Sequence, residues 1–77
     1  MNKSELKEKL DLLGINENFY SLSGALLPDR VILYNSYDEW LVLYFDERGN
    51  RNDEQTFSSE NEACQYIYNK FKRLGNI

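Results

Sequence analysis

The stretch that decides the fold is residues 39–46, which read Glu39-Trp40-Leu41-Val42-Leu43-Tyr44-Phe45-Asp46. β-Branched and aromatic residues favour strands, and no other part of the chain is as rich in apolar strand formers. Its apolar side chains fill both alternating sets, with Leu41, Leu43 and Phe45 on one face and Trp40, Val42 and Tyr44 on the other. We therefore expect a central strand, covered by a helix on one face and by aromatic side chains on the second.

Further strands are expected on both sides of this segment. Residues 30–34 (Arg-Val-Ile-Leu-Tyr) form a β-branched and aromatic run that begins after Pro28 and ends at the polar turn 35–38. After residue 46, the turn-forming residues 47–53 lead into a short edge strand at residues 54–57. Residues 16–24 are compatible with either a short strand or a packed turn, because periodicity does not distinguish the two over so few residues.

A helix is predicted before the strands, at residues 3–13. Leu6, Leu10 and Leu13 recur at helical spacing with charged residues between them. Asn2 and Glu5 have the spacing of a capping box, with Ser4 as an alternative cap. Gly14 is expected to end the helix, and Ile15 to fold back onto its last turn.

A second helix is predicted after the strands, at residues 60–74, with Ser59 and Glu62 as its capping box. Cations near its C-terminus complement the helix dipole, and Gly75 is expected to end it. Its apolar face consists of Ala63, Ile67, Phe71 and Leu74. The predicted fold is α+β: an antiparallel meander of three to four strands flanked by an N-terminal and a C-terminal helix (α-β-β-β-α).

Length and charge limit the possible functions. The chain has 77 residues, which we interpret as a single domain over residues 1–77. Thirteen acidic and nine basic residues give a net charge of −4, which disfavours direct nucleic-acid binding. No apolar run reaches the roughly 20 residues needed to span a bilayer, and the N-terminus lacks the pattern of a signal peptide. We expect a cytoplasmic protein that does not bind membranes.

The residues that usually carry catalysis are scarce. The chain has no histidine and one cysteine, so a disulfide framework and a multi-cysteine metal site are excluded. Cys64 is interpreted as a small core residue, with a reactive thiol at a helix N-terminus as the alternative. We expect a protein that is not an enzyme and that uses no cofactor and no metal.

Three acidic doublets stand at predicted strand ends: Asp38-Glu39, Asp46-Glu47 and Asp53-Glu54. They allow three interpretations: solubilising turn residues, a catalytic carboxylate pair, or, if one sheet edge gathers them, a negative field for a basic partner. The ten Tyr and Phe residues and one Trp exceed what one small core needs. The surplus either anchors a partner or covers the second sheet face.

The partner-binding prediction combines these acidic and aromatic residues. It rests on charge and expected exposure, and it comprises Tyr37, Asp38, Glu39, Trp40, Tyr44, Asp46, Glu47 and Asp53.

Four segments, in this order, resemble a group of small immunity proteins of bacterial polymorphic toxin and contact-dependent inhibition systems. They are residues 21–29 (Ser-Leu-Ser-Gly-Ala-Leu-Leu-Pro-Asp), the strand around Trp40, residues 44–50 (Tyr-Phe-Asp-Glu-Arg-Gly-Asn) and residues 57–66 (Phe-Ser-Ser-Glu-Asn-Glu-Ala-Cys-Gln-Tyr). The chain departs from the family pattern at Ala25, where the family has Gly, and by an extra Leu before Pro28.

The resemblance implies a function: binding and neutralising one cognate toxin, often a nuclease with a basic active site, by occluding its active or substrate-binding surface. The expected partner is therefore a basic toxin domain, and the chain itself is expected to be a monomer or a weak homodimer. The alternative is a non-enzymatic adaptor or regulatory module that binds a protein other than a toxin.

Overall fold

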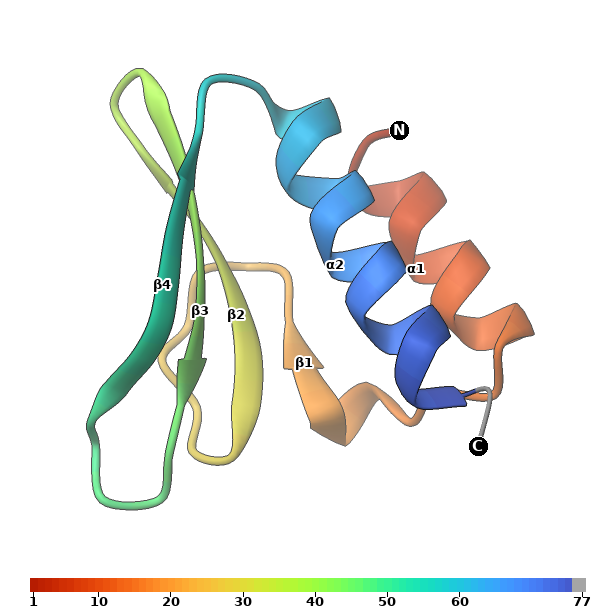
Figure 1. The fold of residues 1–77 in the computed structure, drawn as a ribbon, viewed down its shortest axis with the longest axis horizontal. Coiled ribbons are helices and arrows are strands. Elements are labelled where there is room, and N and C mark those ends of the chain that lie inside the picture. The colour runs from red at the N-terminus through yellow and green to blue at the C-terminus, as the bar shows by residue number, and fades with distance from the viewer. Residues whose placement is uncertain (76–77) are drawn as a thin grey trace.

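The computed structural model describes the backbone of residues 1–75 and the side chains of residues 1–73. It is an α+β arrangement of two helices and a four-stranded sheet, as predicted (Figure 1). Its elements in chain order are α1 (Lys3–Leu12), the single 3-10 turn η1 (Glu17–Phe19), β1 (Tyr20–Ser21), β2 (Arg30–Ser36), β3 (Glu39–Phe45), β4 (Arg51–Phe57) and α2 (Glu60–Gly75).

The sheet has the strand order β1-β2-β3-β4, and its last three strands form the expected antiparallel meander. The sheet is mixed, however, because β1 pairs parallel with β2 through Tyr20 and Val31. A parallel pair needs a crossover, and residues 22–29 supply it by passing behind β2 and β3 (Figure 1). Residues 16–24, for which the sequence allowed either a short strand or a packed turn, therefore contain the two-residue strand β1, preceded by η1.

The last strand, β4, begins three residues earlier than predicted, at Arg51. Its register with β3 shifts between Val42 and Tyr44, close to Asp53, whose φ is +54°. This irregularity is a β-bulge, which adds a residue to one strand without ending the pairing. Residues 51–53 are polar and follow Gly49 and Asn50, so the sequence placed them in the turn, although they belong to β4.

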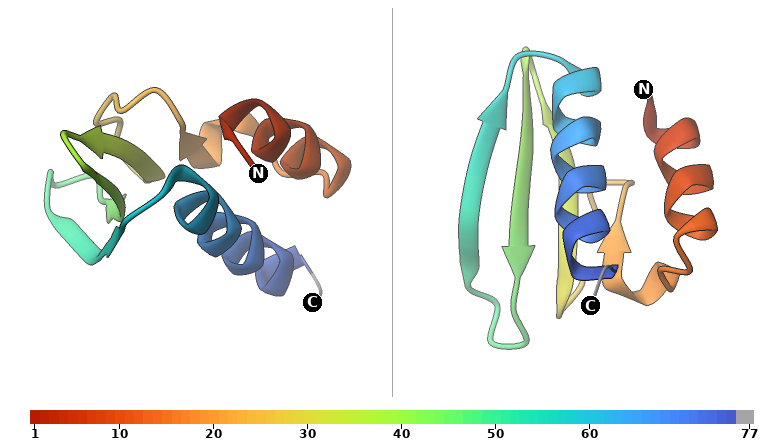
Figure 2. Two further views of the ribbon diagram at one scale, coloured as in Figure 1. Left: turned by 90° about the horizontal axis from the view of Figure 1, so that it is seen from above. Right: turned by 45° about the vertical axis from the view of Figure 1, so that its right-hand side comes forward.

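Alternation along β3 separates two buried layers. On one face, Val42 joins Val31 and Leu33 in a cluster with the helix residues Leu6, Leu10 and Ile67. On the other face, Ile32 and its register partner Leu43 are buried outside that cluster. Figure 2 shows α2 on the first side, with α1 packed beside it, and the crossover loop on the second.

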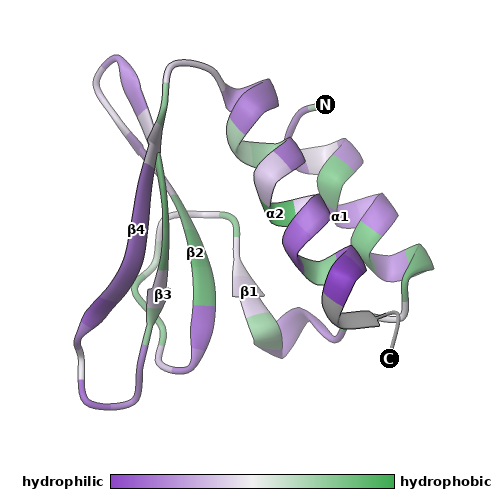
Figure 3. Ribbon diagram, in the orientation of Figure 1, coloured by the Kyte–Doolittle hydropathy of each residue, from purple (hydrophilic) through white to green (hydrophobic). Residues whose placement is uncertain are grey.

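Tyr34 and Phe45 share the second face with Ile32 and Leu43, and the loop 22–29 covers this face as well. The loop comes close enough that a Cβ on Gly24 would lie 3.4 Å from the Tyr34 ring. Trp40 and Tyr44 lie on the helix-facing side, where they are half-buried against the core cluster. In Figure 3 β2 carries hydrophobic colour, hydrophobic and hydrophilic stretches alternate along both helices, and β4 is hydrophilic.

Both ends of α1 follow the predicted motifs. Asn2 accepts a hydrogen bond from the Glu5 N–H at 2.9 Å, and the Glu5 carboxylate accepts one from the Asn2 N–H. At the other end, Gly14 has a φ of +78°, and the Ile15 N–H donates to the Leu10 carbonyl at 3.0 Å. This pair of features is a Schellman motif, which satisfies carbonyls that the helix leaves free.

Half of the predicted capping box is present at the start of α2: the Glu62 N–H donates to Ser59 Oγ at 3.2 Å, whereas the Glu62 carboxylate accepts from Ser58 Oγ at 3.4 Å. Ala63, Ile67 and Phe71 are buried, which confirms the apolar face over these positions. The helix extends through Gly75. The fourth predicted position of the face, Leu74, has a side chain outside the described residues.

Candidate functional site

The β2–β3 turn brings three of the predicted partner-binding residues together: Tyr37, Asp38 and Glu39, called the tip below. Ser36 and Glu39 are register partners, so Tyr37 and Asp38 form a two-residue hairpin turn. The φ of Tyr37 is +55°, and its side chain is 101% exposed. Asp38 and Glu39 are exposed, and neither has an ion-pair partner among the described residues. Figure 1 shows the turn projecting beyond the rest of the sheet.

Asp46 and Glu47 lie at the opposite end of β3, in the β3–β4 turn. The seven residues of β3 place the two doublets roughly 20 Å apart. Asp46 Oδ1 accepts hydrogen bonds from the N–H groups of Arg48 at 2.9 Å and Asn50 at 2.8 Å. Its Oδ2 accepts a third from Asn52 Nδ2 at 3.1 Å. These bonds, led by that of the Asn50 backbone, lower the pKa of Asp46, so Asp46 organises the turn.

Two further members of the predicted surface are paired within the fold. Asp53 lies inside β4, not at its end, and its carboxylate is 3.2 Å from Lys70 Nζ on α2. Tyr44 is half-buried, and its hydroxyl donates to Asp29 Oδ1 at 3.2 Å. Burial and the bond to Asp29 raise the pKa of the Tyr44 hydroxyl, which stays a donor at neutral pH.

Trp40 is next to the tip in sequence but faces the helices. Its ring is half-buried against the core cluster, opposite Phe57 of β4. Lys3 Nζ lies 5.6 Å from the ring centroid, a cation–π contact that ties the start of α1 to β3. Trp40 thus connects elements of the fold.

The expectation that one sheet edge gathers the acidic doublets is therefore wrong. Consecutive antiparallel turns alternate between the two ends of a sheet, so the doublets before and after β3 point away from each other. The β3–β4 turn also carries Arg48, and Arg51 at the start of β4 lies 4.0 Å from the Glu54 carboxylate. The tip is the part of the predicted surface that remains together, exposed and uncompensated.

Cys64 lies on the buried side of α2 and is 0% exposed. Burial is the main cause that raises the pKa of its thiol to about 11, so the thiol is protonated at neutral pH. The interpretation as a small core residue is confirmed.

Two classes of feature are not found in the part of the chain that the structure describes. Its acidic and cysteine side chains form no group of three or more that could hold a metal ion. None of the described helices has the length and apolarity needed to cross a membrane.

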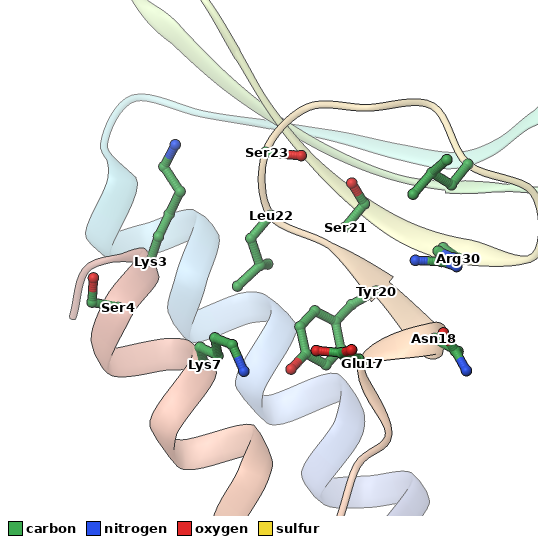
Figure 4. Close-up of a pocket in the computed structure, with 11 residues that line it drawn as sticks. Lys3, Ser4, Lys7, Glu17, Asn18, Tyr20, Ser21, Leu22, Ser23 and Arg30 are labelled. Atoms are coloured by element: carbon green, nitrogen blue, oxygen red, sulfur yellow. The ribbon is translucent and has the colours of Figure 1, made fainter.

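A hollow of about 510 Å³, which the sequence did not predict, opens between α1 and β1 (Figure 4). Its charged lining residues are Lys3, Lys7, Arg30 and Glu17. Its remaining lining is Ser4, Asn18, Tyr20, Ser21, Leu22, Ser23 and Leu27. We call it the α1–β1 hollow. The α1–β1 hollow is lined by basic and hydroxyl side chains from segments that are distant in sequence, although the protein as a whole is acidic.

Comparison of the chain with protein-family models, with curated proteins and with solved structures finds no match.

Proposed function

We propose that the protein is an immunity protein that binds a cognate bacterial toxin in the cytoplasm and occludes its active or substrate-binding surface. The observation that carries this proposal is Tyr37, a fully exposed aromatic side chain at the first position of the β2–β3 turn, followed by two exposed carboxylates. Tyrosine is enriched among the residues that dominate binding energy at protein interfaces. The resemblance of residues 21–29, 44–50 and 57–66 to immunity proteins supplies the partner class.

The net charge of −4 and the tip together suit a basic partner. Carboxylates at an exposed tip accelerate the encounter with a positive surface, and this acceleration weakens as salt screens the charges. Tyr37 then supplies contact area at low conformational cost, because its side chain has only two rotatable bonds. A nuclease whose phosphate-binding cleft is filled in this way no longer admits its substrate.

Co-expression with the toxin encoded by the adjacent gene tests the function. We expect cells that make the wild-type protein to survive toxin induction, and the purified pair to form a one-to-one complex. Killing of cells that make abundant folded wild-type protein would refute the proposal.

Variants of the tip test the site. Tyr37→Ala should weaken toxin binding by roughly 30-fold or more, mainly through faster dissociation. Asp38→Lys combined with Glu39→Lys should slow association by about tenfold at low salt. Glu47→Lys combined with Glu8→Lys is the matched control, with the same change in charge on exposed residues away from the tip, and should leave the association rate nearly unchanged. Equal rates for the tip and control variants would remove the tip from the interface.

A further inference from the structure

The second face of the sheet loses its cover as it approaches the tip. Ile32 and Leu43, a register pair in the middle of the sheet, are 0% and 2% exposed. The next pair towards the tip on the same face is Tyr34 with Leu41, where Tyr34 is 41% exposed and Leu41 is half-buried. Figure 1 shows the loop 22–29 crossing behind the sheet well short of the tip. An aromatic and an aliphatic side chain are therefore partly uncovered beside it.

Two further side chains extend this exposed surface. Glu39 at the start of β3 is exposed and lies on the same face as Leu41, because side chains alternate along a strand. Leu26 is 41% exposed and belongs to the loop 22–29, which passes close to the Tyr34 ring. We call Leu26, Tyr34, Glu39 and Leu41 the side patch.

Charge distinguishes the two sides of the hairpin that carries the tip. On the helix-facing side, Lys3 lies over the Trp40 ring, and the Met1 ammonium donates to Asn61 Oδ1 at the start of α2. These two cations accompany the Glu60 carboxylate, which accepts a hydrogen bond from the Lys3 N–H at 3.0 Å. Positive and negative groups are therefore mixed on the helix-facing side.

On the second face, the arginines of the strands lie far from the tip. Arg30 and Arg51 are both register partners of Phe45, at the opposite end of β3. The loop 22–29 contains no lysine or arginine. The side patch carries one charge, the Glu39 carboxylate, which has no ion-pair partner among the described residues. A basic partner thus meets a favourable charge on this side and mixed charge on the other.

We infer that a positively charged surface of the cognate toxin covers the tip and the side patch together, with Tyr34 as a second aromatic anchor beside Tyr37. A stable complex buries about 800 Å² on each partner, which the three residues of the tip do not supply alone. The side patch adds aromatic and aliphatic surface bordered by a carboxylate, a composition that suits the centre and rim of an interface. This inference rests on the proposed function, and it specifies the face of the hairpin on which the toxin lies.

Two adjacent substitutions test which face the toxin covers. Tyr34 and Asn35 are both exposed, are neighbours on β2 and lie on opposite faces of the sheet. Tyr34→Arg should weaken binding to the purified toxin roughly tenfold or more, because it removes an anchor and places a cation against a basic surface. Asn35→Arg adds the same charge on the helix-facing side and should change the affinity by less than about threefold. Isothermal titration calorimetry measures both.

A pair of exposed leucines provides a second comparison. Leu26→Arg should weaken toxin binding by roughly fivefold or more, whereas Leu12→Arg, the same change on α1, should alter it by less than about twofold. An NMR cross-saturation measurement on the complex needs no substitution. When the unlabelled toxin is irradiated, the methyl signals of Leu26 and Leu41 should lose intensity and those of Leu12 should not.

The outcomes separate this inference from the proposed function. A wild-type protein that does not bind the toxin refutes the proposed function, and the role of the side patch with it. If the wild type binds and Tyr37→Ala weakens binding, but Tyr34→Arg and Asn35→Arg have equal effects, only the inference about the side patch is overturned. A larger loss for Asn35→Arg would place the toxin on the helix-facing side. Urea unfolding verifies that each variant is folded, and for a variant that is not, cross-saturation of the wild-type complex decides.

Discussion

Tyr37 combines two unfavourable properties at a single residue. Its φ of +55° is a conformation that costs a non-glycine residue roughly 1–2 kcal/mol. Its side chain is wholly exposed, so no burial offsets this cost. A two-residue hairpin turn with positive φ at its first position ordinarily has Gly there. A tyrosine at this position is explained by the partner contact that we propose.

Tyr37→Gly should therefore stabilise the free protein while it weakens toxin binding. We expect a gain of up to about 1 kcal/mol in the free energy of unfolding, measured by urea denaturation, because relief of strain exceeds the added freedom of the unfolded chain. Asp29→Gly is the comparison, since Asp29 also has positive φ but holds the Tyr44 hydroxyl. A destabilised Tyr37→Gly protein would show that the tyrosine supports the fold.

Asp46 gives the stability a dependence on pH. Hydrogen bonds from the Asn50 and Arg48 backbones and the Asn52 side chain lower the pKa of its carboxyl group in the folded state. The ionised form is thus favoured by folding, and its stabilisation is present above the unfolded pKa of about 4. This stabilisation is lost as the pH falls below about 4 through the folded pKa.

Asp46→Ala should lower the urea midpoint near neutral pH, and the difference from wild type should shrink as the pH falls below about 4. Glu47→Ala, one residue further along the same turn, has no such bonds and should show no comparable change. A difference that stays constant over this range would mean that the charge of Asp46 does not support the turn.

At the scale of elements, α1 depends on two leucines that face α2 and the sheet. Leu6 and Leu10 are each 0% exposed, whereas Leu12 on the same helix is 87% exposed. Leu10→Ala should cost about 2–5 kcal/mol, a large part of the stability of so small a domain. Leu12→Ala is the matched control and should change stability by less than about 0.5 kcal/mol. Thermal unfolding followed by circular dichroism measures both, and similar losses would contradict the placement of α1.

The exposed strand β4 has features that disfavour pairing with another strand. One side of β4 pairs with β3, and six of its seven residues are exposed. Its charged side chains and the bulge near Asp53 interrupt the flat edge that another chain would need for pairing. The Asp53–Lys70 contact also ties β4 to α2.

At the scale of the whole molecule, one core connects all the layers. α2 contacts β2, β3, β4 and α1, so neither the sheet nor the helix pair keeps its buried surface without the other. Trp40 reports on this junction, because its ring lies between the Phe57 strand and Lys3 of α1.

The chain should therefore unfold in a single cooperative step. The Trp40 fluorescence, which reports on the sheet, and the far-ultraviolet circular dichroism, which is dominated by the helices, should give the same urea midpoint. Different midpoints would show that the sheet and the helices unfold separately.

Much of the fold follows from local residue patterns. The capping box of Asn2 and Glu5, the Gly14 termination and the alternation along β3 depend on interactions within a few residues, so the sequence predicts them well. The bulge near Asp53 and the parallel pairing of Tyr20 with Val31 were missed, because both depend on a partner strand. The candidate site was predicted in part, since Tyr37, Asp38 and Glu39 are neighbours in the chain.

The sequence by itself determined the order of helices and strands, their caps, most of the core and the excess of acidic charge. Only the tertiary structure decided which carboxylates remain exposed and unpaired among the described residues. Alternating turns separate Asp38 from Asp46, and Lys70 pairs with Asp53. Only the crossover between β1 and β2 brings Tyr20 into register with Val31. The physical reason is the separation in sequence of the residues involved. Periodicity and capping depend on residues a few positions apart, whereas an interface or a ligand site consists of residues that only folding brings together.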